Sequence, residues 1–224
     1  MASIISPSPW SIAVVGAGAL GSPMVWGLVR LSMAHEVRVI DGDVVERSNL
    51  PRQPWYSEED VGQPKVEVLA RAIGGAGSSV GITAVPQMLG EANARDLLVG
   101  CDMVLDGSDN WLTRRVIERW AWDVGRPWIF ASALRWEGMT GLMEPGHACL
   151  RCQFGEEVVE GPRCFETGVV GSLTLTVAGK ALAIAEQAWR TPQSAPQQWW
   201  LIDGWSGTVT AIIRKGRRCV HYGA

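Results

Sequence analysis

Three glycines and a carboxylate near the N-terminus have types and spacing that suit chemistry on a nucleotide. Gly16, Gly18 and Gly21 form a Gly-x-Gly-x-x-Gly pattern between a short apolar run and a segment with helical spacing. Glycines at such a turn let the backbone approach a phosphate, and the start of the helix presents unpaired N–H groups to it. Asp41 follows 20 residues after Gly21, at the end of the next apolar run, where a carboxylate accepts hydrogen bonds from ribose. This pattern alone does not separate NAD from ATP.

The loop after Asp41 is rich in cations and hydrogen-bond donors. Within DGDVVERSNLPRQ and the following VGQPK, the candidate ligands of a nucleotide are Asp43, Asn49, Arg52, Gln53 and Lys65. Arg52 offers a fork of donors and Lys65 a point charge, which suits phosphates and the charge that develops on leaving pyrophosphate. A dehydrogenase has little use for so many donors, so the loop favours a triphosphate.

A third polar group follows the strand predicted at 103–106. Asp109 and Asn110 fall in the turn at its end, so they face the same crevice as the glycines. Asp109 offers the hard oxygen ligands that Mg²⁺ prefers. Capping of the next helix is the alternative role for both residues, and the two roles are compatible.

The apolar periodicity predicts an α/β fold, with a Rossmann-like doubly wound, mostly parallel sheet. The expected strands are 11–15, 36–40, 80–85, 103–106 and 128–133, and the expected helices are 20–31, 65–73, 91–98 and 111–124. After residue 135 we expect a strand at MTGLMEP, a turn at CLRCQF, a long helix at 169–190 and two closing antiparallel strands, WWLID and TVTAIIR. That helix is apolar on most faces, which fits either core burial or the seam of a homodimer. We expect one domain over 1–224.

Composition excludes several other classes of protein. A net charge of -3 gives no basic surface for nucleic acid or an anionic membrane. The first residues lack the pattern of a signal peptide, and the apolar stretches are shorter than the about 18 residues that span a bilayer. Five cysteines, an odd number, suit a reducing compartment. We therefore expect a cytoplasmic protein that binds neither nucleic acid nor membrane.

In order along the chain, GAGALGS, DGDVVERSNLPRQ, VGQPK, DGSDNWLTR, CLRC and GVVGSL resemble the ThiF/MoeB/HesA family of E1-like adenylyltransferases, over about residues 11–221. The resemblance implies that ATP and Mg²⁺ bind within residues 11–134 and that a homodimer forms. It implies a substrate, a small ubiquitin-like sulfur-carrier protein ending in Gly-Gly, which docks on residues 135–224 and whose terminal carboxylate attacks the α-phosphate. Carried over by position, Asp41 would bind the ribose, Asn49, Arg52 and Lys65 the phosphates, and Asp109 the magnesium. No general base is needed, because a carboxylate is ionised at neutral pH.

The cysteines predict a structural zinc site and a reactive thiol. Cys149 and Cys152 have the spacing of half a tetrahedral zinc site, and Cys219 is a third candidate ligand. The family resembled usually supplies a second Cys-x-x-Cys there, but position 222 is tyrosine. Either the fourth ligand is His221 or His147, with His221 favoured beside Cys219, or the site has degenerated. Cys164 resembles a family cysteine that links covalently to the carrier or transfers sulfur; a bystander thiol is the alternative. Cys101 fits a core position.

Other functions of the same fold stay open at this point. The family resembled has an N-terminal helix whose arginine reaches the partner's site, whereas only MASIISPSPW precedes the first strand here. Either another arginine of this chain takes that role, or the two active sites of the dimer depend less on each other, or activity is reduced. The alternatives are therefore an inactive or scaffolding homologue, and an enzyme that adenylates a small-molecule or tRNA-attached carboxylate.

Overall fold

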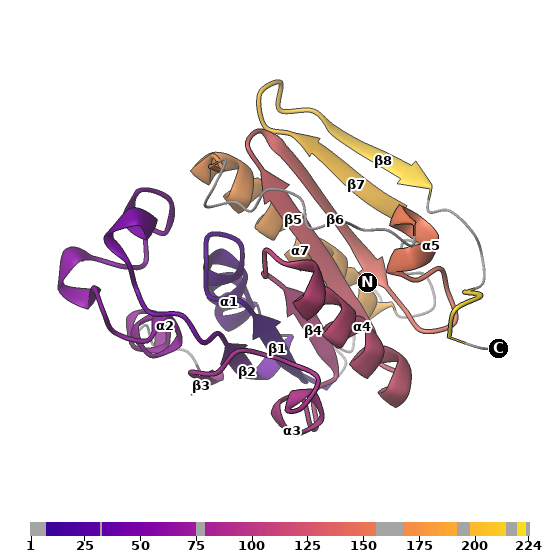
Figure 1. Cartoon of the computed structure of the whole chain (residues 1–224), viewed down its shortest axis with the longest axis horizontal. Coiled ribbons are helices and arrows are strands. Elements are labelled where there is room, and N and C mark those ends of the chain that lie inside the picture. The colour runs from indigo at the N-terminus through magenta and orange to yellow at the C-terminus, as the bar shows by residue number, and fades with distance from the viewer. Residues whose placement is uncertain are drawn as a thin grey trace, which may run out of the picture.

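Eight strands form one sheet, in the order β3-β2-β1-β4-β5-β6-β7-β8 (Figure 1). The computed structural model describes residues 8–31, 33–74, 79–155, 168–191, 198–213 and 219–222. The strands are β1 (Trp10–Val15), β2 (Ala34–Ile40), β3 (Gly81–Val85), β4 (Met103–Asp106), β5 (Trp128–Leu134), β6 (Glu137–Met143), β7 (Gln198–Asp203) and β8 (Val209–Ile213). The first five pair in parallel and the last three add antiparallel neighbours. This confirms the predicted α/β fold with its C-terminal antiparallel extension.

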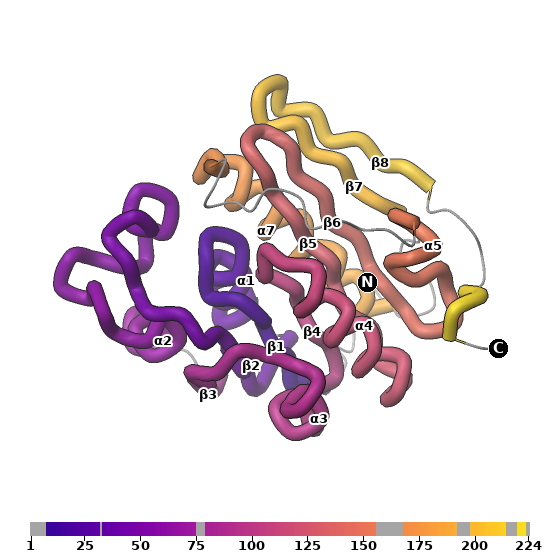
Figure 2. The backbone as a smooth tube through the Cα atoms, in the orientation of Figure 1, coloured from indigo at the N-terminus to yellow at the C-terminus, as the bar shows by residue number. Residues whose placement is uncertain are grey.

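Helices cover both faces of the parallel part. They are α1 (Gly21–Arg30), α2 (Lys65–Gly74), α3 (Ala94–Leu97), α4 (Trp111–Val124), α5 (Leu150–Phe154) and α7 (Gly171–Arg190), with short 3-10 turns η1 (Arg47–Arg52) and η2 (Glu58–Asp60). Side chains of α1, α2 and α7 share one apolar core with one face of the sheet, and those of α3 and α4 share a second core with the other face. Figure 2 shows the same helices and strands as a continuous backbone tube. In the described part of the chain, no helix is both long enough and apolar enough to cross a membrane.

Local sequence explains where the elements near the crevice begin and end. The Asn110 side chain accepts a hydrogen bond from the backbone N–H of Thr113 at 2.8 Å and so caps α4. The helix ends at Gly125, whose φ of 69° is the left-handed conformation that glycine adopts without strain. The long helix α7 packs on α1, β5 and β6, so its apolar residues are largely buried within the chain.

The predicted turn at CLRCQF is wrong, because Leu150–Phe154 form the helix α5. The segment is only a turn and a half long, and Gly155 ends it with a φ of 95°, so its sequence carries too few positions for helical periodicity to show. The helix expected at 91–98 is shorter, Ala94–Leu97. The predicted loop at 192–198 lies outside the described residues up to 197, and Gln198 already belongs to β7.

The parallel strands deliver their last residues to one edge of the sheet. The order places β1 between β2 and β4, so the chain leaves β1 and β4 toward opposite faces. A crevice forms outside the carboxyl ends at such a switch point. The segments after Val15, Ile40 and Asp106 meet there.

Candidate active site

A cavity of about 580 Å³ lies at this switch point. Ten residues singled out in the sequence line it: Gly16, Gly18, Asp41, Asp43, Asn49, Arg52, Gln53, Lys65, Asp109 and Asn110. They come from the segments after β1, β2 and β4 and from the start of α2, so residues far apart in the chain share one space. Ala133 of β5 and Thr174 of α7 complete the wall beside Val169.

Glycines allow the backbone after β1 and the backbone after β4 to come into direct contact. Gly16 has a φ of 96°, and a Cβ on it would lie 2.7 Å from the carbonyl carbon of Gly107. A Cβ on Gly21 would collide with the carbonyl oxygen of Gly16, and one on Gly107 would lie 2.7 Å from the Cα of Gly21. Gly21 does not line the cavity in the described part of the chain, and its missing side chain lets the turns after β1 and β4 pack against each other.

Asp41 ties β2 to the glycine turn. Its Oδ2 accepts a hydrogen bond from the backbone N–H of Ala17 at 2.6 Å, and its Oδ1 accepts one from the backbone N–H of Asp43 at 2.8 Å. Burial raises the pKa of this carboxyl, while these hydrogen bonds and nearby Lys65 act in the opposite direction. Both oxygens keep further lone pairs, which can accept from a ribose hydroxyl.

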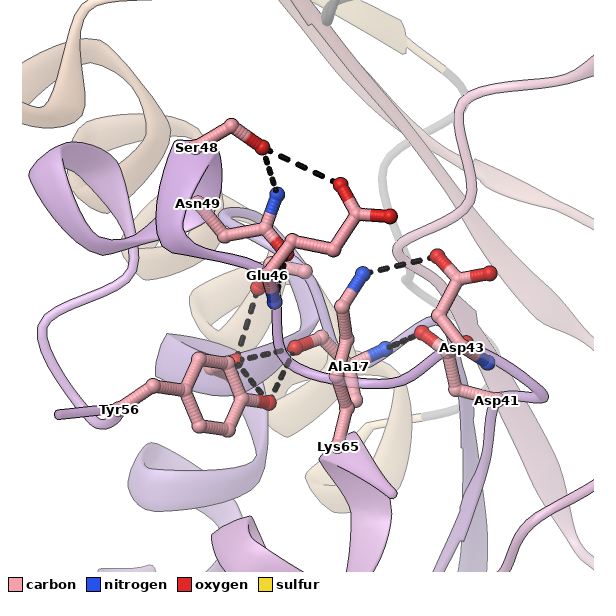
Figure 3. A network of polar contacts seen from close by, with 10 residues as sticks. Ala17, Asp41, Asp43, Glu46, Ser48, Asn49, Tyr56 and Lys65 are labelled. Carbon is pink, nitrogen blue, oxygen red and sulfur yellow. Dashed lines mark hydrogen bonds and ion pairs between the residues drawn. The ribbon is translucent and has the colours of Figure 1, made fainter. Parts of the chain in front are cut away.

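Lys65 and Asp43 form an ion pair at the wall of the cavity (Figure 3). The Lys65 Nζ lies 2.8 Å from Asp43 Oδ2, and its backbone N–H donates to the Asp43 carbonyl oxygen at 3.0 Å. The lysine side chain is 8% exposed and the aspartate 58%, so the ammonium is held inside while the carboxylate faces solvent. This arrangement holds the ammonium in one place at the cavity wall, paired with a carboxylate that lines the same cavity.

Arg52 and Asn49 are held by the loop's own backbone. Arg52, half-buried at the end of η1, donates from Nη1 to the Ser48 carbonyl oxygen at 2.7 Å. Asn49 is buried, and its Oδ1 accepts from the backbone N–H of Glu46 at 3.2 Å, as one half of a capping box. These bonds orient two potential ligand side chains before any ligand arrives.

The cavity fits a phosphorylated nucleotide. The amide of Gln53 lines it, and its buried Oε1 has no hydrogen-bond partner among the described residues. A buried polar group without a partner is costly, so the site calls for a polar ligand, and a half-turn of the amide presents its N–H₂ instead. Together with Arg52, Lys65 and the glycine turn, this amide suits phosphate oxygens, and the exposed Asp109 suits a magnesium ion shared with them.

A buried ion pair supports the turn that carries Asp109. The Arg114 guanidinium contacts Asp106 Oδ2 at 3.0 Å and donates to the carbonyl oxygens of Ser108 at 3.0 Å and Ala131 at 3.1 Å. Ser108 in turn donates its N–H and its hydroxyl to Asp106 Oδ1 at 2.9 and 2.6 Å. The sequence analysis did not predict this pair. The feature that could have indicated it is Arg114, which lies one helical turn after the cap residue Asn110 and can reach back to the end of β4.

A cluster of cysteine and histidine side chains lies beyond the end of β6, which pairs with the start of β5 and so lies at the edge of the sheet opposite the crevice. The ligand atoms of Cys149, Cys152, Cys219 and His221 all lie within 4.8 Å of one another. The two sulfurs of Cys149 and Cys152 are 3.7 Å apart, close to the about 3.8 Å expected between two thiolates on one tetrahedral zinc. His221 Nδ1 lies 3.2 and 3.4 Å from these sulfurs. Among the described residues this group contains His221 and not His147, so the donor set fits zinc with His221 as fourth ligand.

The other two cysteines, Cys101 and Cys164, lie outside the cluster. Cys101 is buried in the second apolar core, as expected. Cys164 lies outside the described residues. Four polar residues that the sequence did not single out, Glu46, Ser108, Thr113 and Thr174, also line the cavity.

Comparisons with known proteins place this chain in a family. The ThiF family matches residues 8–219. The chain is 37% identical over 168 residues to the SAMP-activating enzyme E1 of Haloferax volcanii, covering 74% of this chain and 62% of that protein. It is 36% identical over 178 residues to the sulfur carrier protein adenylyltransferase of Thermus thermophilus, covering 75% of this chain and 64% of that protein. The chain thus spans less than two thirds of either relative.

Solved structures show the same fold. E. coli MccB with ATP aligns with a TM-score of 0.78 at 19% identity, over 94% of this chain and 65% of that one. E. coli MccB with succinimide aligns with a TM-score of 0.80 at 20% identity, over 96% and 66%. With its glycine turn, its cationic loop and a family match over nearly its whole length, this chain belongs to the ThiF family.

Proposed function

We propose that this protein uses ATP to adenylate the C-terminal glycine carboxylate of a small ubiquitin-like sulfur-carrier protein. The observation that carries the proposal is the shared cavity, where a glycine turn, two cations and an exposed carboxylate face one space. Arg52 and Lys65 suit a triphosphate, and Asp109 suits the magnesium that accompanies it. The names of the two relatives, a SAMP-activating enzyme and a sulfur carrier protein adenylyltransferase, support this substrate class.

In the proposed reaction a carboxylate oxygen attacks the α-phosphorus of ATP. A new O–P bond forms while the bond from the α-phosphorus to the oxygen shared with the β-phosphate breaks, and pyrophosphate leaves with that electron pair. Arg52 and Lys65 stabilise the charge that moves onto the leaving group. Magnesium at Asp109 would neutralise part of the phosphate charge. The enzyme's task is to bring two anions together, which explains a wall built around cations.

The test is ATP–pyrophosphate exchange with and without a carrier that ends in Gly-Gly. Arg52→Ala should lower exchange by about 100-fold or more, because a preorganised donor to developing charge is lost. Arg47→Ala is the matched control, since Arg47 lies in the same loop, is 80% exposed and pairs with Glu58 outside the cavity lining. Equal exchange in the two variants would remove Arg52 from the mechanism.

The carrier dependence of exchange separates the alternatives. Exchange that needs the carrier, and is lost when its terminal glycine is deleted, supports the proposal. Exchange without any carrier supports an enzyme that acts on a small-molecule or tRNA-attached carboxylate. Stabilisation by ATP and Mg²⁺ without exchange under any condition supports a scaffolding homologue.

We propose that the carrier docks on the antiparallel extension. Leu201 of β7 and Ile212 of β8 are 40% and 38% exposed, and Met139 of β6 pairs with Leu201. These three side chains lie on the same face as Trp199, opposite α7, because strand residues alternate between faces. Leu201→Glu should therefore raise the KM for the carrier and leave stabilisation by ATP unchanged. Val99→Glu, at a 64% exposed position after α3, is the control.

We propose further that Cys149, Cys152, Cys219 and His221 hold a structural zinc ion, which fits the reducing conditions of the cytoplasm. Metal analysis should find about one zinc per chain. His221→Ala should lose the metal and His147→Ala should keep it; the reverse result would reassign the fourth ligand. A later thiol-transfer step at Cys164 stays a prediction.

A homodimer is also part of the proposal. The exposed apolar residues Trp26 of α1 and Leu175 of α7, 49% and 51% exposed, lie on neighbouring helices of one layer and offer a seam. Sedimentation should give a dimer that Leu175→Glu weakens. A monomer in the wild type at all concentrations would contradict this assignment.

A further inference from the structure

Tyr56 donates a hydrogen bond to the backbone of the glycine turn, at Ala17 (Figure 3). The residue sits between η1 and η2 and is 6% exposed. Its hydroxyl donates to the carbonyl oxygen of Ala17 at 2.6 Å. The Ser22 hydroxyl, on α1, lies 2.7 Å from the same oxygen and 3.5 Å from the Tyr56 hydroxyl. Two hydroxyl groups from separate elements therefore meet at one backbone carbonyl.

Ala17 is held at both of its backbone groups. On the other side of the residue, its N–H donates to Asp41 Oδ2 at 2.6 Å. The residue therefore has its N–H tied to β2 and its carbonyl tied to Tyr56 and Ser22. Such a clamp removes the rotation that a glycine on each side would otherwise allow.

The clamp determines the direction of the next N–H group. In a planar trans peptide, the carbonyl of one residue and the N–H of the next point in opposite directions. The Ala17 carbonyl points to Tyr56, which lies outside the cavity lining in the described part of the chain, whereas Gly18 lines the cavity. The Gly18 N–H is thereby directed away from Tyr56, toward the space that the proposed nucleotide fills.

We infer that Tyr56 is a positioning residue for nucleotide binding: its hydroxyl fixes the Ala17–Gly18 peptide so that the Gly18 N–H donates to a phosphate oxygen of ATP. The inference rests on the proposed function. Without the hydroxyl, the Ser22 hydroxyl alone holds the carbonyl, and the peptide next to Gly18 can rotate. The phosphate then loses an oriented donor while every cationic side chain stays in place.

The chain supplies its own control, because Tyr56 and Tyr222 are its only two tyrosines. Tyr222 donates to Glu118 Oε2 at 3.3 Å and stacks on Trp122 with ring centroids 4.8 Å apart, next to the cysteine cluster. Tyr56→Phe and Tyr222→Phe each remove one partly buried hydroxyl and keep the ring. Only the first should change the binding of ATP.

The experiment measures the Kd of MgATP by calorimetry and the steady-state kinetics of carrier-dependent exchange, below the unfolding transition of each variant. Tyr56→Phe should raise the Kd and the KM for ATP about tenfold, the effect of one hydrogen bond, with kcat changed less than about twofold. Tyr222→Phe should match the wild type.

The measurements distinguish a failure of the role of Tyr56 from a failure of the proposed function. If the wild type binds ATP and catalyses exchange but Tyr56→Phe binds ATP as tightly as Tyr222→Phe, the role of Tyr56 is overturned and the proposed function stands. A lowered kcat with an unchanged KM overturns the role in phosphate positioning as well. If the wild type neither binds MgATP nor catalyses exchange, the proposed function falls and this inference falls with it.

Discussion

Replacing Arg114 by methionine should destabilise the protein by about 3–5 kcal/mol, because it leaves a buried carboxylate without its cation. The Arg114 side chain is 7% exposed and that of Asp106 is fully buried. Burial raises the pKa of Asp106, and Arg114 acts most strongly against that rise. The substitution also takes a donor from the carbonyl oxygens of Ser108 and Ala131. Methionine fills most of the volume, so the loss is electrostatic rather than a cavity.

Urea unfolding at pH 7 provides the measurement, with Arg115→Met as control. Arg115 is the next residue of the same helix and is exposed, so its replacement should change stability by no more than about 0.5 kcal/mol. At roughly 2–4 °C per kcal/mol for a chain of this size, Arg114→Met should lower Tm by about 6–20 °C. Adding Asp106→Asn should recover part of the loss, since the buried charge is then gone. Equal stability of the Arg114 and Arg115 variants would refute the reasoning.

Three further predictions follow from packing, titration and metal content. Gly21→Ala should prevent normal folding because its Cβ meets backbone. Gly74→Ala should instead gain about 0.5–1 kcal/mol, because Gly74 is exposed in α2 and the nearest atom to the added Cβ, Ile82 Cδ1, is 3.8 Å away; thermal melts of both variants decide this. Hydrogen bonds from the Ser57 backbone and side chain hold the pKa of Asp60 below its ordinary value of 3.8, so Asp60→Asn should cost up to about 1 kcal/mol at pH 7. That cost should vanish as the pH falls through the lowered pKa in acid unfolding curves, because protonation removes the contribution of the carboxylate. A zinc chelator should lower the Tm of the wild type and leave that of His221→Ala unchanged, as differential scanning fluorimetry would show.

The sequence predicted the elements best where their ends carry local signals. The strand 103–106 and the helix 111–124 match the structure residue for residue, because Asn110 caps the helix and Gly125 ends it. The helix at 150–154 was missed, because five residues are too few to show a period. Cap residues act within one or two helical turns, so they define the ends of an element, whereas periodicity needs a longer segment to be recognised.

The candidate site was predictable as a set of residues, but not as a set of contacts. That Asp43 would hold the Lys65 ammonium depends on the bridge between Val44 and Pro64, which joins the two ends of the loop. That Tyr56 would reach Ala17 depends on the path of the same loop, which places Tyr56 beside Ser22 at the start of α1. Neither contact has a spacing that a sequence pattern can express, since both are set by tertiary packing.

The interlocked glycines decide which part of the site can adjust to a ligand. Gly16, Gly21 and Gly107 bring the turns after β1 and β4 together with no side chain between them, so neither turn can shift without moving the other. A backbone junction packed this closely leaves no free volume into which either turn could move. The floor of the cavity is therefore rigid. Accommodation to a nucleotide falls to the parts of the segment 42–64 that lie between its points of attachment, which include the Val44–Pro64 bridge and the hydrogen bond from Tyr56 to Ala17.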